Sequence, residues 1–337
     1  MRDKMNLTIK NIAELAGVSP STVSKVMNKY SGVSDKTRKK VLDVIKEKEY
    51  HPMFTARTLA TKKSKLIGLI YAGKINVDFN HPFFNEVVTA FKKIIGKLGY
   101  DIIVFSNEGF EHDGGSYLAR CKYYHVEGCV IIAGDEVEEG IQELVNSGIP
   151  CVGIDIELNG PRASYVMTDN ESLSKKVVQQ LYLSGIRDIG YIGSTRDSVV
   201  AKNRKIGFIK TMNQLGMDIK ENWMQYGDFY EESGYLAMNK IMKKKPYPKA
   251  VFAISDLMAF GALRAIEEKG LNVPEDIRII GCDDIHACRY SSPKLSTMRQ
   301  QKDMLGKFAA NILNDLINDT KKIKPILIDS ELIIRES

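Results

Sequence analysis

The chain has 337 residues, of which 44% are hydrophobic and 27% are charged, a composition typical of a globular protein and not of a disordered one. No apolar run reaches the length of a membrane-spanning helix, and residues 1–4 lack the apolar stretch of a signal peptide. The five cysteines are scattered and odd in number, so we expect reduced thiols and a cytoplasmic protein.

The positive charge is concentrated at the start of the chain. Residues 1–65 carry 15 Lys and Arg against 6 Asp and Glu, whereas the rest of the chain has a balance of −3. The net charge of +6 therefore comes from the N-terminal segment alone. A small basic module beside a nearly neutral body indicates a polyanionic partner for the module.

The first 28 residues predict two short helices joined by a tight turn. Thr8 can cap the first helix, and Gly17 can end it in the left-handed conformation. Ser19 can cap the second helix, whose first position is taken by Pro20, where no backbone N–H is needed. The expected buried face of the first helix consists of Ile9, Ile12, Ala13, Leu15 and Ala16.

The second helix is expected to have an apolar back and a polar, basic front. Val23, Val26 and Met27 recur at helical spacing and should face inward, which leaves Ser21, Lys25 and Asn28 on the opposite side. A helix of this kind suits the major groove of DNA.

A third helix is expected to begin after Ser34 and to stop before Pro52, with Val41, Leu42, Val44 and Ile45 packed on the first two. Residues 53–65 are basic and only weakly helical, and Leu59 is the apolar residue at their centre. They predict a hinge that orders on contact with DNA.

The run Ile-Ala-x-x-Ala-Gly-Val-Ser-x-x-Thr-Val-Ser-x-Val-x-Asn, which starts at Ile12, resembles the LacI/GalR family of transcription regulators. The resemblance implies that Pro20, Ser21 and Lys25 read base edges, and that Ala56 and Leu59 enter the minor groove. It also implies a set of residues that position the phosphates, namely Ser19, Thr22, Ser24, Asn28 and Tyr50.

Beyond residue 65 the pattern changes to apolar strands that alternate with helices. Continuous apolar strands of this kind predict parallel sheets covered on both faces, and about 270 residues favour two lobes over one sheet. The expected fold is an all-α helix-turn-helix module plus an α/β core of two doubly wound parallel-sheet lobes. By resemblance this core is similar to periplasmic sugar-binding proteins.

The expected domain boundaries follow these changes in pattern. Residues 1–52 form the DNA-binding module, 53–65 the hinge and 66–337 the core for ligand binding and dimerisation. Lobe 1 is expected at about 66–167 and 300–325, and lobe 2 at about 168–299 and 326–337.

Polar residues at the carboxyl ends of the predicted strands mark an effector cleft, because ligands bind there in open α/β sheets. Asp155, Asp169, Ser255 and Asp283 follow such strands, and Arg204 lies early in a predicted helix. With Phe83, Phe84 and Phe229 as aromatic walls, the resemblance implies a sugar site. Asp256 and Asp284 are interpreted as helix caps.

The segment from Cys282 to Cys288 does not have the spacing of a zinc site, so we expect no metal and no cofactor. None of the common nucleotide, hydrolase or metalloprotease motifs is present, and we expect that the chain is not an enzyme.

The sequence therefore predicts a cytoplasmic, homodimeric, sequence-specific repressor of carbohydrate-use genes, released from double-stranded operator DNA by a small sugar-type effector. Two alternatives stay open at this point. One is a global regulator whose core takes a corepressor nucleotide or a phosphoprotein that strengthens DNA binding, and the other is a sugar-processing enzyme fused to a DNA-binding module.

Overall fold

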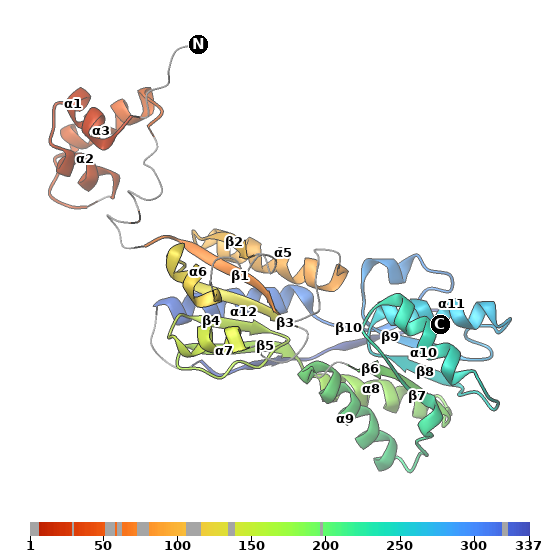
Figure 1. Cartoon of the computed structure of the whole chain (residues 1–337). Coiled ribbons are helices and arrows are strands. Elements are labelled where there is room, and N and C mark those ends of the chain that lie inside the picture. Colours follow the sequence, from red (N-terminus) through yellow and green to blue (C-terminus); the bar gives the residue numbers. More distant parts are fainter. Residues whose placement is uncertain are drawn as a thin grey trace. The chain divides into compact units, whose positions relative to one another are not determined.

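The computed structural model describes residues 7–28, 30–50, 58, 63–72, 81–105, 116–133, 139–195, 198–318 and 323–337. The chain divides into two compact units, Met1–Ser64 and Lys65–Ser337. Figure 1 shows a small helical unit at the N-terminal end of the chain and a larger unit of sheets and helices. Most of the predicted hinge, including Ala56 and Leu59, lies outside the described residues.

The first unit contains α1 (Ile9–Ala16), α2 (Pro20–Met27) and α3 (Asp35–Glu47). The side chains of Thr8, Ser19 and Ser34 cap these three helices by accepting backbone N–H groups. Gly17 ends α1 with φ of 58°, a conformation that glycine adopts without a Cβ penalty. The predicted caps and the helix-turn-helix are thus confirmed.

The three helices enclose a small core of Ile12, Ala13, Ala16, Val23, Val26, Val41 and Tyr50. The prediction that Leu15 and Leu42 are buried was wrong, since these side chains are 51% and 47% exposed. At 100° per residue, Leu15 points about 60° outside the stripe that Ile12, Ala13 and Ala16 bury on α1. Short helices in such a small unit bury only a narrow stripe.

The second unit contains two sheets, each of six strands in its described part. The sheet of lobe 1 has the order β11-β5-β4-β3-β1-β2, and that of lobe 2 has the order β12-β10-β9-β8-β6-β7. The described pairs are parallel except for β10 with β12, which is antiparallel. This confirms the predicted core of two parallel-sheet lobes.

In lobe 1 the strands are β1 (Leu66–Ala72), β2 (Asp101–Phe105), β3 (Gly128–Ala133), β4 (Cys151–Ile154), β5 (Ala163–Thr168) and β11 (Ile326–Ile328). Its helices are α5 (Pro82–Lys97), α6 (Tyr117–Tyr123), α7 (Glu139–Asn146) and α12 (Lys302–Asn318). α12 packs on α5 so closely that a Cβ on Gly306 would lie 2.4 Å from the carbonyl oxygen of Val87.

In lobe 2 the strands are β6 (Ile189–Ser194), β7 (Met224–Gly227), β8 (Ala250–Ala253), β9 (Arg278–Asp283), β10 (Ser296–Arg299) and β12 (Glu331–Ile333). Its α-helices are α8 (Asn170–Leu183), α9 (Val199–Gln214), α10 (Glu231–Ile241) and α11 (Asp256–Glu268). Two short 3₁₀ helices, η1 (Glu221–Trp223) and η2 (His286–Arg289), complete the lobe.

The chain passes between the lobes after β5, after β10 and between β11 and β12. The expectation that residues 326–337 belong wholly to lobe 2 was wrong, because Ile326–Ile328 pairs with β5 in the sheet of lobe 1. Residues 331–333 return to lobe 2 as β12. The apolar run 326–328 looks the same in sequence whichever sheet it joins.

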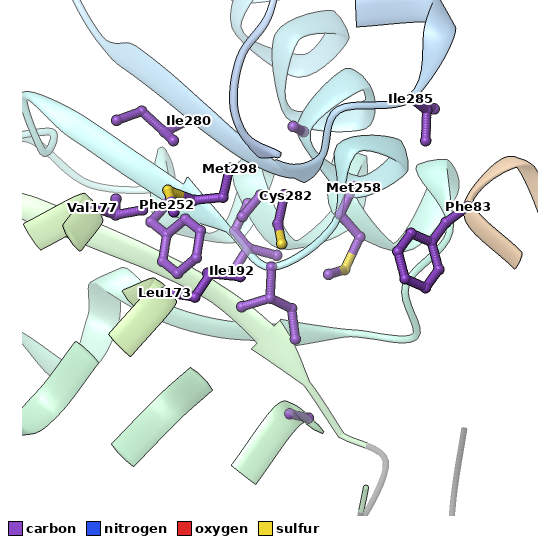
Figure 2. Packing of buried hydrophobic residues seen from close by; sticks show 14 of the residues in the cluster. Phe83, Leu173, Val177, Ile192, Phe252, Met258, Ile280, Cys282, Ile285 and Met298 are labelled. Carbon is purple, nitrogen blue, oxygen red and sulfur yellow. The ribbon is translucent and has the colours of Figure 1, made fainter. Parts of the chain in front are cut away.

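The strands are apolar along their length because helices cover both faces of each sheet. In lobe 2, Figure 2 shows Phe252, Ile192 and Met298 of the sheet close to Leu173 and Val177 of α8. All five cysteines are free and buried. Within the described residues, no helix is both long and apolar enough to cross a membrane.

Candidate functional site

A cavity lies between the two lobes, at the carboxyl ends of their strands, where the fold places ligands. Lobe 1 contributes the start of α5 and the residue after β4 to the lining of this cavity. Lobe 2 contributes the start of α9, the residue that follows β7 by two positions, and the end of β9. Its lining consists of His81, Phe83, Phe84, Asp155, Ser198, Val200, Arg204, Phe229, Asp283 and Gln300. Six of the eight effector residues expected from the sequence are therefore brought together here.

Arg204 is the central cation of the cavity and is only 2% exposed. Its Nε donates to Oδ1 of Asn170 at 2.8 Å, and its Nη1 donates to the carbonyl oxygen of Ile254 at 2.5 Å. Burial opposes the charged form, but nearby Cys282, Asp283 and Asp155 raise the pKa of Arg204. The guanidinium is thus charged and held in one orientation.

Two carboxyl groups face this cation. Burial raises the pKa of Asp155 to about 6, although Arg204 opposes the shift, and burial also raises the pKa of Asp283. Oδ1 of Asp283 accepts a hydrogen bond from Nε2 of Gln300 at 2.7 Å. Oδ1 of Asp155 is buried without a hydrogen-bond partner. An unsatisfied buried oxygen of this kind needs a partner that a ligand can supply.

Three non-glycine residues of the cavity have positive φ. The values are 58° for Asp155, 77° for Phe229 and 131° for Asp283. Side chains rarely adopt this backbone conformation, and such strain concentrates at functional sites. The fold thus holds both acids and the Phe229 ring at positions that an unconstrained turn would not favour.

His81, which was not among the residues expected from the sequence, is buried at the lobe 1 side of the cavity. Burial lowers the pKa of His81, although Asp283 opposes the shift, so the ring is neutral near pH 7. Its Nδ1 has no hydrogen-bond partner, and its ring centre lies 5.9 Å from that of Tyr230 in lobe 2. The sequence signal was available, since His81 immediately precedes the Pro82-Phe83-Phe84 start of α5.

Gln300, Ser198 and Val200 were also missed. Gln300 lies in the connection from β10 to α12, where no motif marks it. Ser198 caps α9 by accepting from the backbone N–H of Ala201 at 3.1 Å. These residues line the site because the connections between the strands bring them there, and no local sequence pattern marks them.

Two expected effector residues do not line the cavity. Asp169 caps α8 by accepting from the N–H of Ser172 at 3.1 Å, and it borders a different hollow. Ser255 caps α11 and donates its hydroxyl hydrogen to the carbonyl oxygen of Phe229 at 2.9 Å. Ser255 therefore helps to hold the backbone of Phe229 in its positive-φ conformation without lining the cavity itself.

The interpretation of Asp256 and Asp284 as caps was wrong. Asp256 is fully buried and accepts hydrogen bonds from the backbone of Ile285, from the Cys288 thiol and from the Thr297 hydroxyl. Asp284 forms ion pairs with Arg299 and Arg335 at 2.8 and 2.6 Å. Among the described residues, no group of three His, Cys, Asp or Glu side chains could hold a metal ion.

In the first unit, α2 presents the surface that the sequence predicts for DNA. Ser19, Pro20, Ser21 and Lys25 are exposed, whereas Thr22, Ser24 and Asn28 are half-buried. Tyr50 is only 7% exposed and belongs to the core of the unit. The exposed positions are those through which a helix can reach base edges.

Two family models match the chain. Residues 8–53 match the bacterial regulatory proteins of the lacI family, and residues 178–337 match a periplasmic binding protein-like domain. Among curated proteins, the chain is 35% identical to the HTH-type transcriptional repressor PurR of Pasteurella multocida over 332 residues, which is 98% of both chains. It is 34% identical to the repressor of the same name from Haemophilus influenzae, again over 98% of both.

Two of the solved structures that resemble this chain are also transcription regulators. The complex of the transcriptional regulator CelR with cellobiose has a TM-score of 0.74 and 28% identity, over 98% of this chain and 99% of that one. The lac repressor dimer bound to operator and the anti-inducer ONPF has a TM-score of 0.83 and 26% identity over 98% of both chains.

A helix-turn-helix module followed by a two-lobed, periplasmic-binding-protein-like core defines a DNA-binding transcription regulator. The relatives agree over nearly their full length, and the chain belongs to the lacI family of bacterial regulatory proteins.

Proposed function

We propose that this protein is a cytoplasmic, homodimeric repressor that binds an operator through α2 and is released from it by a sugar-type effector in the inter-lobe cavity. The observation that carries the effector proposal is the pair of unsatisfied buried atoms, Oδ1 of Asp155 and Nδ1 of His81. Both belong to residues that line the cavity. A hydroxyl-rich ligand would supply the missing hydrogen bonds.

The other groups in the cavity support the same class of ligand. Arg204 and Asp283 offer a charged donor and an acceptor for hydroxyl groups. Phe83, Phe84 and Phe229 offer apolar faces for the C–H side of a sugar ring. The solved complex of the transcriptional regulator CelR with cellobiose contains a ligand of this chemistry.

The switch follows from the size of the cavity. Its free volume is about 40 Å³, which is room for only a few water molecules. A sugar therefore requires the lobes or their side chains to rearrange. If the rearranged state binds operator less well, the ligand shifts the population toward release.

The corepressor alternative is favoured by one observation, the three phenyl rings of the cavity. The planar base of a corepressor nucleotide could stack on these rings. The two candidates differ in ligand chemistry and in the sign of the response, so one experiment separates them.

The test is a thermal-shift screen of the full chain against monosaccharides, disaccharides, sugar phosphates and nucleobases, followed by operator titrations with each hit on DNA selected from a random library. We expect a sugar to raise the melting temperature and to weaken operator binding. Asp155→Asn should remove the shift, because the amide cannot replace a two-oxygen acceptor. Asp169→Asn is the matched control, since Asp169 also follows a strand but lies outside the cavity.

Two results would contradict the proposal. A nucleobase that raises the melting temperature and tightens operator binding would establish the corepressor alternative. A sugar whose effect survives Asp155→Asn and Arg204→Ala would place the effector site outside this cavity.

A further inference from the structure

A second hollow lies on the surface of lobe 2, where η1 leads into β7 and α10 ends. We name it the lysine hollow, after Lys220, Lys240, Lys243, Lys244 and Lys245, which line it together with Trp223. Its volume is about 890 Å³, and no acidic residue is part of its lining. It is therefore a concave surface whose charge has one sign.

The charge of the lysine hollow is largely uncompensated. Lys220 pairs with Asp188 at 2.8 Å. Within the described part of the chain, no ion pair is formed by Lys240, Lys243, Lys244 or Lys245. Like charges held around one hollow repel each other and raise the local concentration of anions. A multivalent anion would relieve the repulsion of several lysines at once.

Trp223 supplies an independent observation that points to a ligand. Its side chain lines the lysine hollow and is 1% exposed, and its buried Nε1 donor has no hydrogen-bond partner. An indole N–H usually finds a partner when it is buried. Nζ of Lys220 lies 3.9 Å from the ring centre, so a lysine covers the ring.

The covered ring also limits the chemistry of the ligand. Because Lys220 covers one face of Trp223 and the side chain is only 1% exposed, no face of the ring is open for stacking on a nucleobase. The remaining contacts are ammonium groups, which bind phosphate as point charges and do not require a planar ligand. Recognition in the lysine hollow therefore depends on the number of anionic groups.

The lysine hollow is separate from the inter-lobe cavity lined by Arg204 and Asp283, which we call the effector cavity after its proposed ligand. β7 starts directly after Trp223 and ends two residues before Phe229, so the two sites lie at opposite ends of the same strand. α10 runs between the same ends, and its 11 residues span about 16 Å at 1.5 Å per residue.

From these observations we propose that the lysine hollow binds a small anion with two or more linked phosphate groups. The proposal does not rest on the identity of the effector, because no residue of the effector cavity takes part. The linked phosphates can be free or carried by a small molecule, since the chemistry that the lysines recognise is the same.

The chain offers a direct reporter for this site, because Trp223 is its single tryptophan. The test follows the intrinsic fluorescence of the full chain during titration with sodium tripolyphosphate, and with sodium chloride at equal ionic strength. We expect a saturable change with tripolyphosphate alone. In the double variant Lys243→Ala/Lys244→Ala the apparent Kd should rise at least tenfold.

The matched control is Lys92→Ala/Lys93→Ala, which removes another exposed pair of adjacent lysines, from α5 in lobe 1, and should leave the apparent Kd unchanged. An equal response of the wild type and the Lys243→Ala/Lys244→Ala variant would overturn the proposal, as would an equal response to sodium chloride. Titration with pyrophosphate and ATP separates the two sources of linked phosphates. Tighter binding of hexaglutamate than of tripolyphosphate would assign the hollow to an acidic protein segment instead.

Discussion

The hydroxyl of Thr168 donates a hydrogen bond to Oε1 of Gln300 at 2.6 Å and thereby joins two of the chain's passages between the lobes. Thr168 ends β5 in lobe 1, and Gln300 lies between β10 and α12. Nε2 of the same amide donates to Asp283. The contact thus fixes which end of the amide faces the effector cavity.

This relationship predicts the behaviour of Thr168→Val. The valine cannot donate, so the Gln300 amide is left with an unpaired buried oxygen, and unfolding should become easier by about 1–3 kcal/mol. The effector should also bind less tightly, because Asp283 loses its fixed donor. Urea denaturation and effector titration measure the two effects.

The control for this prediction is Thr211→Val. Thr211 is similarly buried, but its hydroxyl donates only to the carbonyl of Gly207 within α9. This variant should lose stability without a change in effector affinity. Equal effects of both variants on the effector would show that Gln300 does not position Asp283.

The second prediction concerns DNA. Lys25→Ala should lower the affinity for the selected operator by about 1–3 kcal/mol and change the affinity for random duplexes little, because Lys25 is exposed on the face of α2 that is proposed to read bases. Competition binding at fixed salt measures both affinities. The control is Lys46→Ala, which removes an exposed lysine of α3. This variant should change the affinity for the operator and the affinity for random duplexes to the same extent. Equal losses on both DNAs with Lys25→Ala would refute base reading.

The third prediction concerns pH. Burial raises the pKa of Asp256 to about 7 in the folded protein, against 3.8 for an ordinary aspartate. The folded state therefore binds the proton more tightly than the unfolded state, and stability decreases as the pH rises through about 7. Asp256→Asn should make the urea midpoint less dependent on pH between pH 5 and 8.

The exposed Asp218 provides the matched control for this experiment. Asp218→Asn should keep the wild-type dependence on pH. If Asp256→Asn keeps it as well, then Asp256 is not a source of the linkage, and the buried Asp155 and Asp283 would have to account for it.

The fourth prediction concerns assembly. Light scattering of the full chain should give twice the chain mass of 37.8 kDa, since helix-turn-helix repressors of the proposed kind read two operator half-sites with two modules related by a two-fold axis. The lac repressor relative was crystallised as a dimer. A stable tetramer or a monomer at micromolar concentration would contradict the homodimer.

Local chemistry explains which parts of the structure were predictable. Thr8, Ser19 and Ser34 were identified as caps because a cap depends only on the next three residues. Arg204 and Asp283 were identified from the family resemblance, and Asp283 also because it lies at a strand end. Only the caps have their partners nearby in the sequence, since Arg204 bonds to the distant Asn170 and Ile254.

Residues whose role depends on the crossovers were not predictable in this way. Gln300 reaches the cavity only after two distant segments meet, whereas His81 precedes the predicted Phe83 and Phe84 directly and was overlooked. Conversely, Asp169 and Ser255 follow strands as Asp155 does, but their side chains turn back to cap the next helix. A strand-end position alone does not reveal toward which side a polar side chain turns.

The order of segments along the chain has a consequence for the protein's synthesis. The strands β6–β10 and their helices form one continuous stretch, whereas lobe 1 lacks α12 and β11 until the last residues are made. α12 covers β3, β4 and β5, so this apolar sheet face stays open while more than a hundred residues of lobe 2 emerge from the ribosome. The lobe that is translated first is therefore completed only after nearly all of lobe 2 has been made, and until then the nascent chain presents a surface that chaperones bind.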